Sequence, residues 1–72
     1  MTREEVIEAY KREAPVVFKS DEEGPIRYRR IHGYEVRRKD SGEEEFRVIL
    51  YEEDPKGRIR IALPEEVYQT ED

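Results

Sequence analysis

The pattern of hydrophobic and polar positions changes its period once, close to residue 15. Before that point apolar residues recur at helical spacing, at Val6, Ile7, Tyr10 and Ala14. The stretch Thr2-Arg3-Glu4-Glu5 has the sequence of a capping box, and Pro15 disfavours helical geometry at the residue before it. We therefore predict a helix over residues 2–14, which is too short to be stable unless it packs on other elements.

From residue 15 to residue 68 apolar residues alternate with polar ones, which predicts β-strands. Val16-Val17-Phe18 predicts a short first strand, and Val67-Tyr68 predicts a short last one. Pro64-Glu65-Glu66 predicts a single helical turn just before that last strand. The alternation changes phase at Gly33, which predicts a bulge or a sharp bend in a long strand.

Two turns separate the long strands. Asp40-Ser41-Gly42 predicts a three-residue hairpin loop with glycine in the left-handed conformation, and Asp54-Pro55-Lys56-Gly57 predicts a β-turn. The strands around these turns supply most of the predicted core, with Arg58, Arg60 and Ala62 facing outward. The predicted core residues are Val16, Phe18, Ile26, Tyr28, Ile31, Tyr34, Val36, Phe46, Val48, Leu50, Ile59, Ile61, Leu63 and Val67.

This order of elements predicts an α+β, mainly β fold: a small SH3-like barrel of four or five antiparallel strands with one N-terminal helix. The chain also resembles small bacterial SH3-like barrel proteins of uncharacterised function. The residues that carry the resemblance are Pro15-Val16-Val17-Phe18, Tyr28-Arg29-Arg30-Ile31, Phe46-Arg47-Val48-Ile49-Leu50 and Ile61-Ala62-Leu63-Pro64-Glu65-Glu66-Val67. The resemblance implies a fold and no activity.

Length and composition favour one folded domain over residues 1–72, with a helix at 2–14, a curled sheet or barrel at 15–68 and a frayed tail at 69–72. Charged residues make up 46% of the chain, but its five Tyr and two Phe and its ordered alternation argue against disorder. The absence of cysteine excludes disulfides and thiolate metal sites. With no apolar run long enough for a membrane helix or a signal peptide, we expect a cytoplasmic protein.

The chain has no Asn, a single Gln, and ten Arg against four Lys. Few thermolabile side chains and many ionic ones are typical of thermostable proteins. An engineered, idealised sequence has the same composition. An engineered protein with a fold but no evolved function is therefore one hypothesis for this chain.

No group of residues predicts catalysis, so we expect no enzymatic activity, no cofactor and no metal ion. His32 is the single histidine, and none of the hydroxyl residues lies in a nucleophile motif. Three acidic clusters, at residues 21–23, 43–45 and 52–54, have consecutive carboxylates that would point to opposite faces of a strand. We interpret them as solvated loop ends, with a cation site or an acidic docking surface as the alternative.

The strongest functional signal is the charge of residues 26–39, which carry a local balance of +5 in a chain of net charge −5. The possible nucleic-acid-binding residues are Arg27, Arg29, Arg30, Arg37 and Arg38. A bent strand bearing Arg and Tyr is how small barrels track a nucleic-acid backbone. The competing interpretation is an ion-pair lattice on the outer face, which the overall negative charge favours.

Ile49 and Tyr51 lie out of phase with the predicted core of their strand. Either the N-terminal helix covers them, which we favour because the helix needs a surface to pack on, or they form a partner surface. The leading functional hypothesis is a non-enzymatic interaction module that binds a protein partner or itself through this face or an exposed sheet edge. The alternative is a nucleic-acid-binding accessory protein that uses the basic segment.

Overall fold

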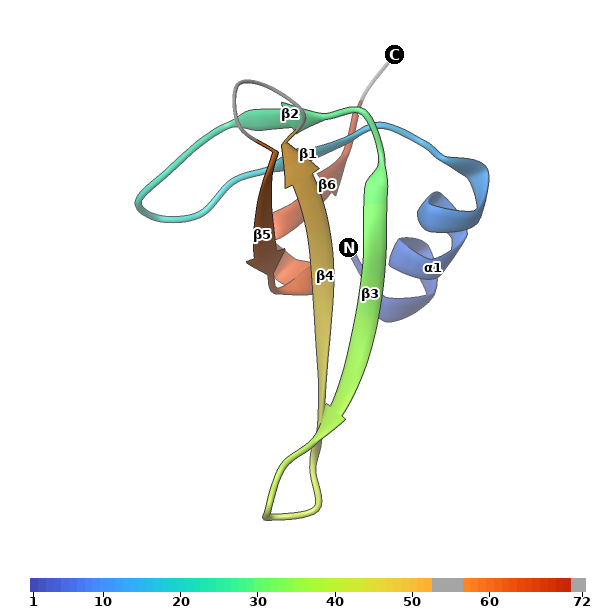
Figure 1. The fold of residues 1–72 in the computed structure, drawn as a ribbon, viewed down its shortest axis with the longest axis vertical. Helices are drawn as coiled ribbons and strands as arrows, with labels where there is room; N and C mark the ends of the chain where they lie inside the picture. Colours follow the sequence, from blue (N-terminus) through green and yellow to red (C-terminus); the bar gives the residue numbers. More distant parts are fainter. Residues whose placement is uncertain (53–56, 71–72) are drawn as a thin grey trace.

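The computed structural model describes residues 1–52 and 57–70, which contain one α-helix, six strands and one 3-10 helix (Figure 1). The elements are α1 (Arg3–Arg12), β1 (Val16–Phe18), β2 (Ile26–Tyr28), β3 (Ile31–Arg38), β4 (Glu44–Glu52), β5 (Arg58–Ala62), η1 (Pro64–Glu66) and β6 (Val67–Gln69). The long β3–β4 hairpin projects well beyond the rest of the molecule at its lower end in Figure 1. Three residues of the predicted turn at 54–57 lie outside the described residues.

The strands form two antiparallel sheets of three strands each, in the orders β2-β1-β6 and β3-β4-β5. The prediction of an SH3-like barrel of four or five strands was therefore wrong, because the described strands number six and do not close a barrel. The chain bends at Arg29 and Arg30, so that β2 and β3 belong to different sheets instead of one continuous curled strand. What the structure supports is a small α+β fold.

The helix begins as its sequence indicates. The backbone N–H of Glu5 donates to the Thr2 hydroxyl at 3.2 Å, and the Glu5 carboxylate accepts from the Thr2 N–H at 2.8 Å, which completes the capping box. The helix ends at Arg12, because Glu13 adopts the left-handed conformation with φ of 54°. The amino group of Met1 donates to the carbonyls of Pro64 and Val67, at 2.8 Å each, and so joins the start of the helix to η1 and β6.

The core lies between the two sheets and is closed on one side by α1. Its buried residues are Val6, Ala9, Val16, Phe18, Tyr28, Ile31, Phe46, Val48, Leu50, Ala62 and Val67. Eight of the fourteen predicted core residues are in this set. The helix packs on the inner face of the second sheet, where the Tyr10 ring meets the Tyr34 ring edge-on at 5.5 Å and the Arg3 guanidinium lies over Phe46.

The predicted orientation of β5 was wrong. Ile59 and Ile61 are 61% and 53% exposed and Leu63 is also exposed, whereas Ala62 is buried at 2%. The reason is the register with β4, which places Ala62 opposite buried Val48 and Ile61 opposite Ile49 on the outer face. Val36, near the end of β3, is exposed as well.

Two local predictions for the β3–β4 hairpin are confirmed. The pairing register shifts between Ile31 and Gly33, which is the bulge predicted from the change of phase. Gly42 has a φ of 93° in the hairpin loop, which is the conformation that glycine adopts without steric cost. Both features arise from a few neighbouring residues, which is why the sequence was sufficient to predict them.

Candidate functional site

The outer face of the second sheet carries an apolar surface, which we call the β4–β5 patch and define as Ile49, Tyr51, Ile59 and Ile61. The register pairs Ile49 with Ile61 and Tyr51 with Ile59, so the four side chains form two adjacent cross-strand rows. Tyr51 is 41% exposed, and Ile59 and Ile61 are more exposed still. The four residues therefore form a contiguous apolar surface on a highly charged chain.

The helix does not cover this patch. The contacts of α1 are with the inner face, through Tyr34 and Phe46. Tyr34 pairs with Val48, and Phe46 pairs with Val36. These four residues lie on the face of the sheet opposite to the patch. The prediction that the helix covers Ile49 and Tyr51 was therefore wrong, and these two residues remain available as a partner surface.

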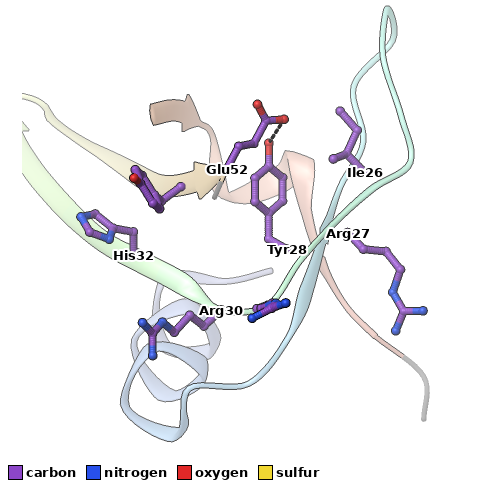
Figure 2. A pocket seen from close by; sticks show the side chains of 8 residues that line it. Ile26, Arg27, Tyr28, Arg30, His32 and Glu52 are labelled. Carbon is purple, nitrogen blue, oxygen red and sulfur yellow. Dashed lines mark hydrogen bonds between the residues drawn. The ribbon is translucent and has the colours of Figure 1, made fainter. Parts of the chain in front are cut away.

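Beside the patch lies an open pocket of about 300 Å³ between the end of β2, the bend before β3 and the end of β4. Its lining residues are Ile26, Arg27, Tyr28, Arg29, Arg30, His32, Tyr51 and Glu52. Figure 2 shows the Tyr28 hydroxyl pointing toward Glu52, while the Arg27 side chain leaves β2 on the opposite side. Tyr51 belongs to both the pocket and the β4–β5 patch.

Two of the lining residues, Tyr28 and Glu52, belong to a hydrogen-bonded group that also includes Arg60. The buried Tyr28 hydroxyl donates to a Glu52 carboxylate oxygen at 3.3 Å and accepts from Arg60 Nε at 3.0 Å. The Arg60 guanidinium also lies over the Phe18 ring at 4.4 Å and donates to Glu23 at 2.9 Å. These contacts explain why an arginine faces inward on β5, since its charge is paired and its planar group is stacked.

Burial raises the pKa of Tyr28 above its ordinary value of about 10, and Arg60 opposes the shift. The folded protein thus holds the phenolic proton more tightly than the unfolded chain does. This contribution to stability is fully present below pH 10 or so and is lost as the pH rises through the folded-state pKa. We expect Tyr28→Phe to cost about 1 kcal/mol at pH 8 and progressively less at higher pH.

The measurement is urea denaturation of both proteins between pH 8 and pH 11. Subtracting the Tyr28→Phe curve from that of the unaltered protein isolates the contribution of Tyr28. A difference between the two proteins that stays constant over this range would contradict the prediction.

The structure divides the five arginines of the predicted nucleic-acid surface into two groups. Arg27, Arg29 and Arg30 lie at the pocket, near β2, whereas Arg37 and Arg38 are at the far end of β3, beside the hairpin tip (Figure 1). The hairpin group is next to acidic residues: Arg37 pairs with Glu45 in the β3–β4 register, and Arg38 lies 3.9 Å from Glu44. Arg30 forms an exposed ion pair with Glu13 at 3.3 Å. The five residues therefore do not form one continuous basic surface.

The other candidate groups carry less chemistry. The His32 ring lies against the Tyr51 ring with centroids 5.5 Å apart, and no Ser, Thr or Cys is among the residues that line the pocket with it. Glu45 accepts from Arg47 at 2.9 Å on the outer face, and this hydrogen bond lowers the pKa of the Glu45 carboxyl. Among residues 1–52 and 57–70, no cluster of His, Asp and Glu is arranged to hold a metal ion.

Sequence reasoning missed half of the β4–β5 patch. Ile59 and Ile61 were assigned to the core because an Ile-Arg-Ile alternation normally buries its isoleucines. Two further signals were available. Ala62 has the same phase as Arg60, so burying Ala62 places Ile59 and Ile61 on the outer face. Ile49 and Tyr51, which lie out of phase with the predicted core, also required an apolar neighbour. The contacts of Arg60 with Phe18, Glu23 and Tyr28 had no signal in the sequence, because these residues are distant from it along the chain.

No family model, curated protein or solved structure matches this chain in the comparisons with known proteins. In the part of the chain that the structure describes, no helix has both the length and the apolar character needed to cross a membrane.

Proposed function

We propose that this protein is a non-enzymatic interaction module that binds an extended segment of a partner protein along β5. The observation that carries the proposal is the combination, on one strand, of an exposed apolar face and an edge position in the sheet. Ile59 and Ile61 belong to the β4–β5 patch, and β5 has β4 as its one neighbour among the described strands. An added strand would form main-chain hydrogen bonds with β5 and extend the patch.

The charge pattern of β5 supports a partner segment in which acidic and apolar residues alternate. Along the strand, Arg58 and Arg60 alternate with Ile59 and Ile61. A segment that alternates acidic and apolar residues would place a carboxylate next to exposed Arg58 and apolar side chains next to the isoleucines, while Arg60 is already paired with Glu23. A second copy of β5 suits this edge less well, since β5 contains no carboxylate to place beside Arg58.

The size of the patch also favours a short segment. Stable dimers of folded proteins bury about 800 Å² on each partner. The β4–β5 patch consists of four side chains, and Ile49 among them is already half-buried. Surrounding charges, such as the Glu45–Arg47 pair at 2.9 Å, limit its extent on the hairpin side. A short strand adds main-chain hydrogen bonds to this limited apolar area and so compensates for it.

The test is an amide chemical-shift titration of labelled protein with a blocked synthetic peptide in which valine and glutamate alternate. We expect shifts concentrated on β5 and on the β4–β5 patch. A peptide of the same composition with its valines and glutamates grouped in two blocks should bind at least about tenfold more weakly, because it cannot match the alternation of β5. Shifts elsewhere, or equal binding of the two peptides, would contradict the proposal.

Two variants identify the surface. Ile61→Lys places a charge in the centre of the patch and should weaken binding of the alternating peptide about tenfold or more. Val36→Lys is the matched control, because Val36 is exposed to a similar degree, at 49%, but lies on the projecting hairpin. Sedimentation over a range of concentrations provides a second check. If the protein dimerises and Ile61→Lys abolishes the dimer, the molecule that occupies the patch is a second copy of this chain and not a partner segment.

A further inference from the structure

The second sheet has another open edge, along β3. In the order β3-β4-β5, β3 has β4 as its one neighbour among the described strands. It is eight residues long, whereas β5 has five residues and the edge strands of the first sheet, β2 and β6, have three each. The end of β3 toward the hairpin loop extends beyond α1 (Figure 1), and its last three residues are exposed. A long unpaired edge of this kind is a template for pairing with another strand.

The hairpin loop shows which backbone groups of β3 point toward this edge. The N–H of Lys39 donates to the carbonyl of Glu43 at 2.8 Å, so this pair occupies a hydrogen-bonded position of the ladder. Hydrogen-bonded and non-hydrogen-bonded positions alternate in an antiparallel pair, so Glu35 and Arg37 direct their N–H and C=O groups toward β4. The residues of β3 near the loop that direct these groups toward the open edge are Tyr34, Val36 and Arg38.

The outer face of β3 carries one charge of each sign near this edge, on Glu35 and Arg37. In the register with β4 these residues lie opposite Arg47 and Glu45, but Arg47 and Glu45 pair with each other along β4 at 2.9 Å. Within residues 1–52 and 57–70, neither Glu35 nor Arg37 has a side-chain hydrogen bond or an ion pair within 4 Å. Two opposite charges, two positions apart on an edge strand, therefore remain available to a strand that pairs there.

The charges select one register for the pairing of two β3 edges. Antiparallel pairing brings outward-directed backbone groups together only when it is centred on a residue and not between two residues. Centring on Glu35 places two carboxylates opposite one another, and centring on Arg37 places two guanidinium groups opposite one another. Centring on Val36 places Glu35 of each strand opposite Arg37 of the other, which makes the edge self-complementary.

We propose that this protein forms a symmetric dimer by antiparallel pairing of β3 with β3 of a second copy, centred on Val36. The two Val36 side chains, each 49% exposed in the single chain, meet at the twofold axis on one face of the sheet, and two Glu35–Arg37 pairs flank the axis on the other. The three-stranded sheets of the two copies become one six-stranded sheet with β5 at each end. The dimer thus leaves β5 open and does not depend on the binding of a partner segment there.

Sedimentation equilibrium between about 10 μM and about 1 mM measures this dimer, which the small apolar area at the axis makes weak. We expect the average mass to rise from monomer toward dimer with concentration. Val36→Lys should weaken the dimer about tenfold or more, because two ammonium groups then meet at the axis. Ile61→Lys is the matched control: Ile61 is 53% exposed but lies on β5, so this variant should dimerise as the unaltered protein does.

Charge reversal tests the register. Glu35→Arg and Arg37→Glu should each weaken self-association about tenfold or more, since each places like charges opposite one another. A mixture of the two variants should form a heterodimer about tenfold tighter than either homodimer, because each opposed pair then joins a basic and an acidic side chain. Both variants keep a net negative charge, so attraction between the whole molecules does not account for a heterodimer.

The heterodimer is measured by amide chemical shifts of labelled Glu35→Arg as unlabelled Arg37→Glu is added. We expect saturable shifts concentrated on residues 33–39. Arg58→Glu is the control for the second component, because it makes the same charge reversal on β5 and should bind labelled Glu35→Arg about tenfold more weakly.

Three results would overturn the proposal. An average mass that stays that of the monomer up to about 1 mM would show that the β3 edge does not pair. A dimer that Ile61→Lys abolishes and Val36→Lys leaves intact would place the interface on the β4–β5 patch. A mixture of the two charge variants that associates no more tightly than each variant alone would show that the register is wrong.

Discussion

Replacing Leu50 with alanine is expected to lower the free energy of unfolding by about 3 kcal/mol. Leu50 is fully buried toward the end of β4, where it pairs with Ile31 on one side and with Arg60 on the other. Its side chain lies between the two sheets, so truncation leaves a cavity that neighbouring strands cannot fill without breaking their pairing. A single domain of this size has a total stability of only about 3–5 kcal/mol, and the variant should therefore be close to unfolded at ambient temperature.

Urea denaturation of the purified variant, with the unfolding monitored by circular dichroism, measures this loss. Ile59→Ala is the matched control, because Ile59 is an aliphatic residue on the adjacent strand but is 61% exposed. Its replacement should change the free energy of unfolding by no more than about 0.5 kcal/mol. Comparable losses for the two variants would mean that β5 is oriented with its isoleucines in the core, contrary to the register described above.

Replacing Gly24 with alanine is expected to destabilise the protein by about 2–3 kcal/mol. Gly24 has a φ of 114°, which L-residues rarely adopt. A Cβ atom at this position would lie 2.9 Å from the backbone oxygen of Phe18 and 2.9 Å from the Cα atom of Lys19. Both are atoms of the main chain at the end of β1, so the clash cannot be relieved by moving a side chain.

Gly33→Ala is the control for this prediction. Gly33 lies at the bulge in β3, but its φ is not positive and no atom lies within 4 Å of the position its Cβ would take. Alanine there should be neutral, or stabilising by about 0.5 kcal/mol through the reduced entropy of the unfolded chain. Thermal unfolding of the two variants should separate them clearly, and a Gly33→Ala variant less stable than Gly24→Ala would refute this assignment.

The sequence alone was sufficient wherever neighbouring residues decide the conformation. The capping box of Thr2 and Glu5, the left-handed Gly42 and the helical turn at Pro64 are confirmed, because each depends on interactions within a few residues. The bulge near Gly33 was also predicted, since a change of phase is visible in the alternation itself. The local sequence does not show that replacing Gly24 lowers stability more than replacing Gly33. The clash at Gly24 comes from the fold of the loop around it.

The tertiary structure decided which face of β5 is buried and how the strands assemble. Alternation has a period of two, so a shift of one residue reverses every side chain, and the Ile-Arg-Ile pattern favours the wrong face. Contacts with distant residues determine the outcome: Phe18, Glu23 and Tyr28 pair and stack with Arg60 inside, and Ile49 pairs with Ile61 outside. The same long-range packing places Arg29 and Arg30 beside Tyr51, and separates them from Arg37 and Arg38 by most of the length of β3.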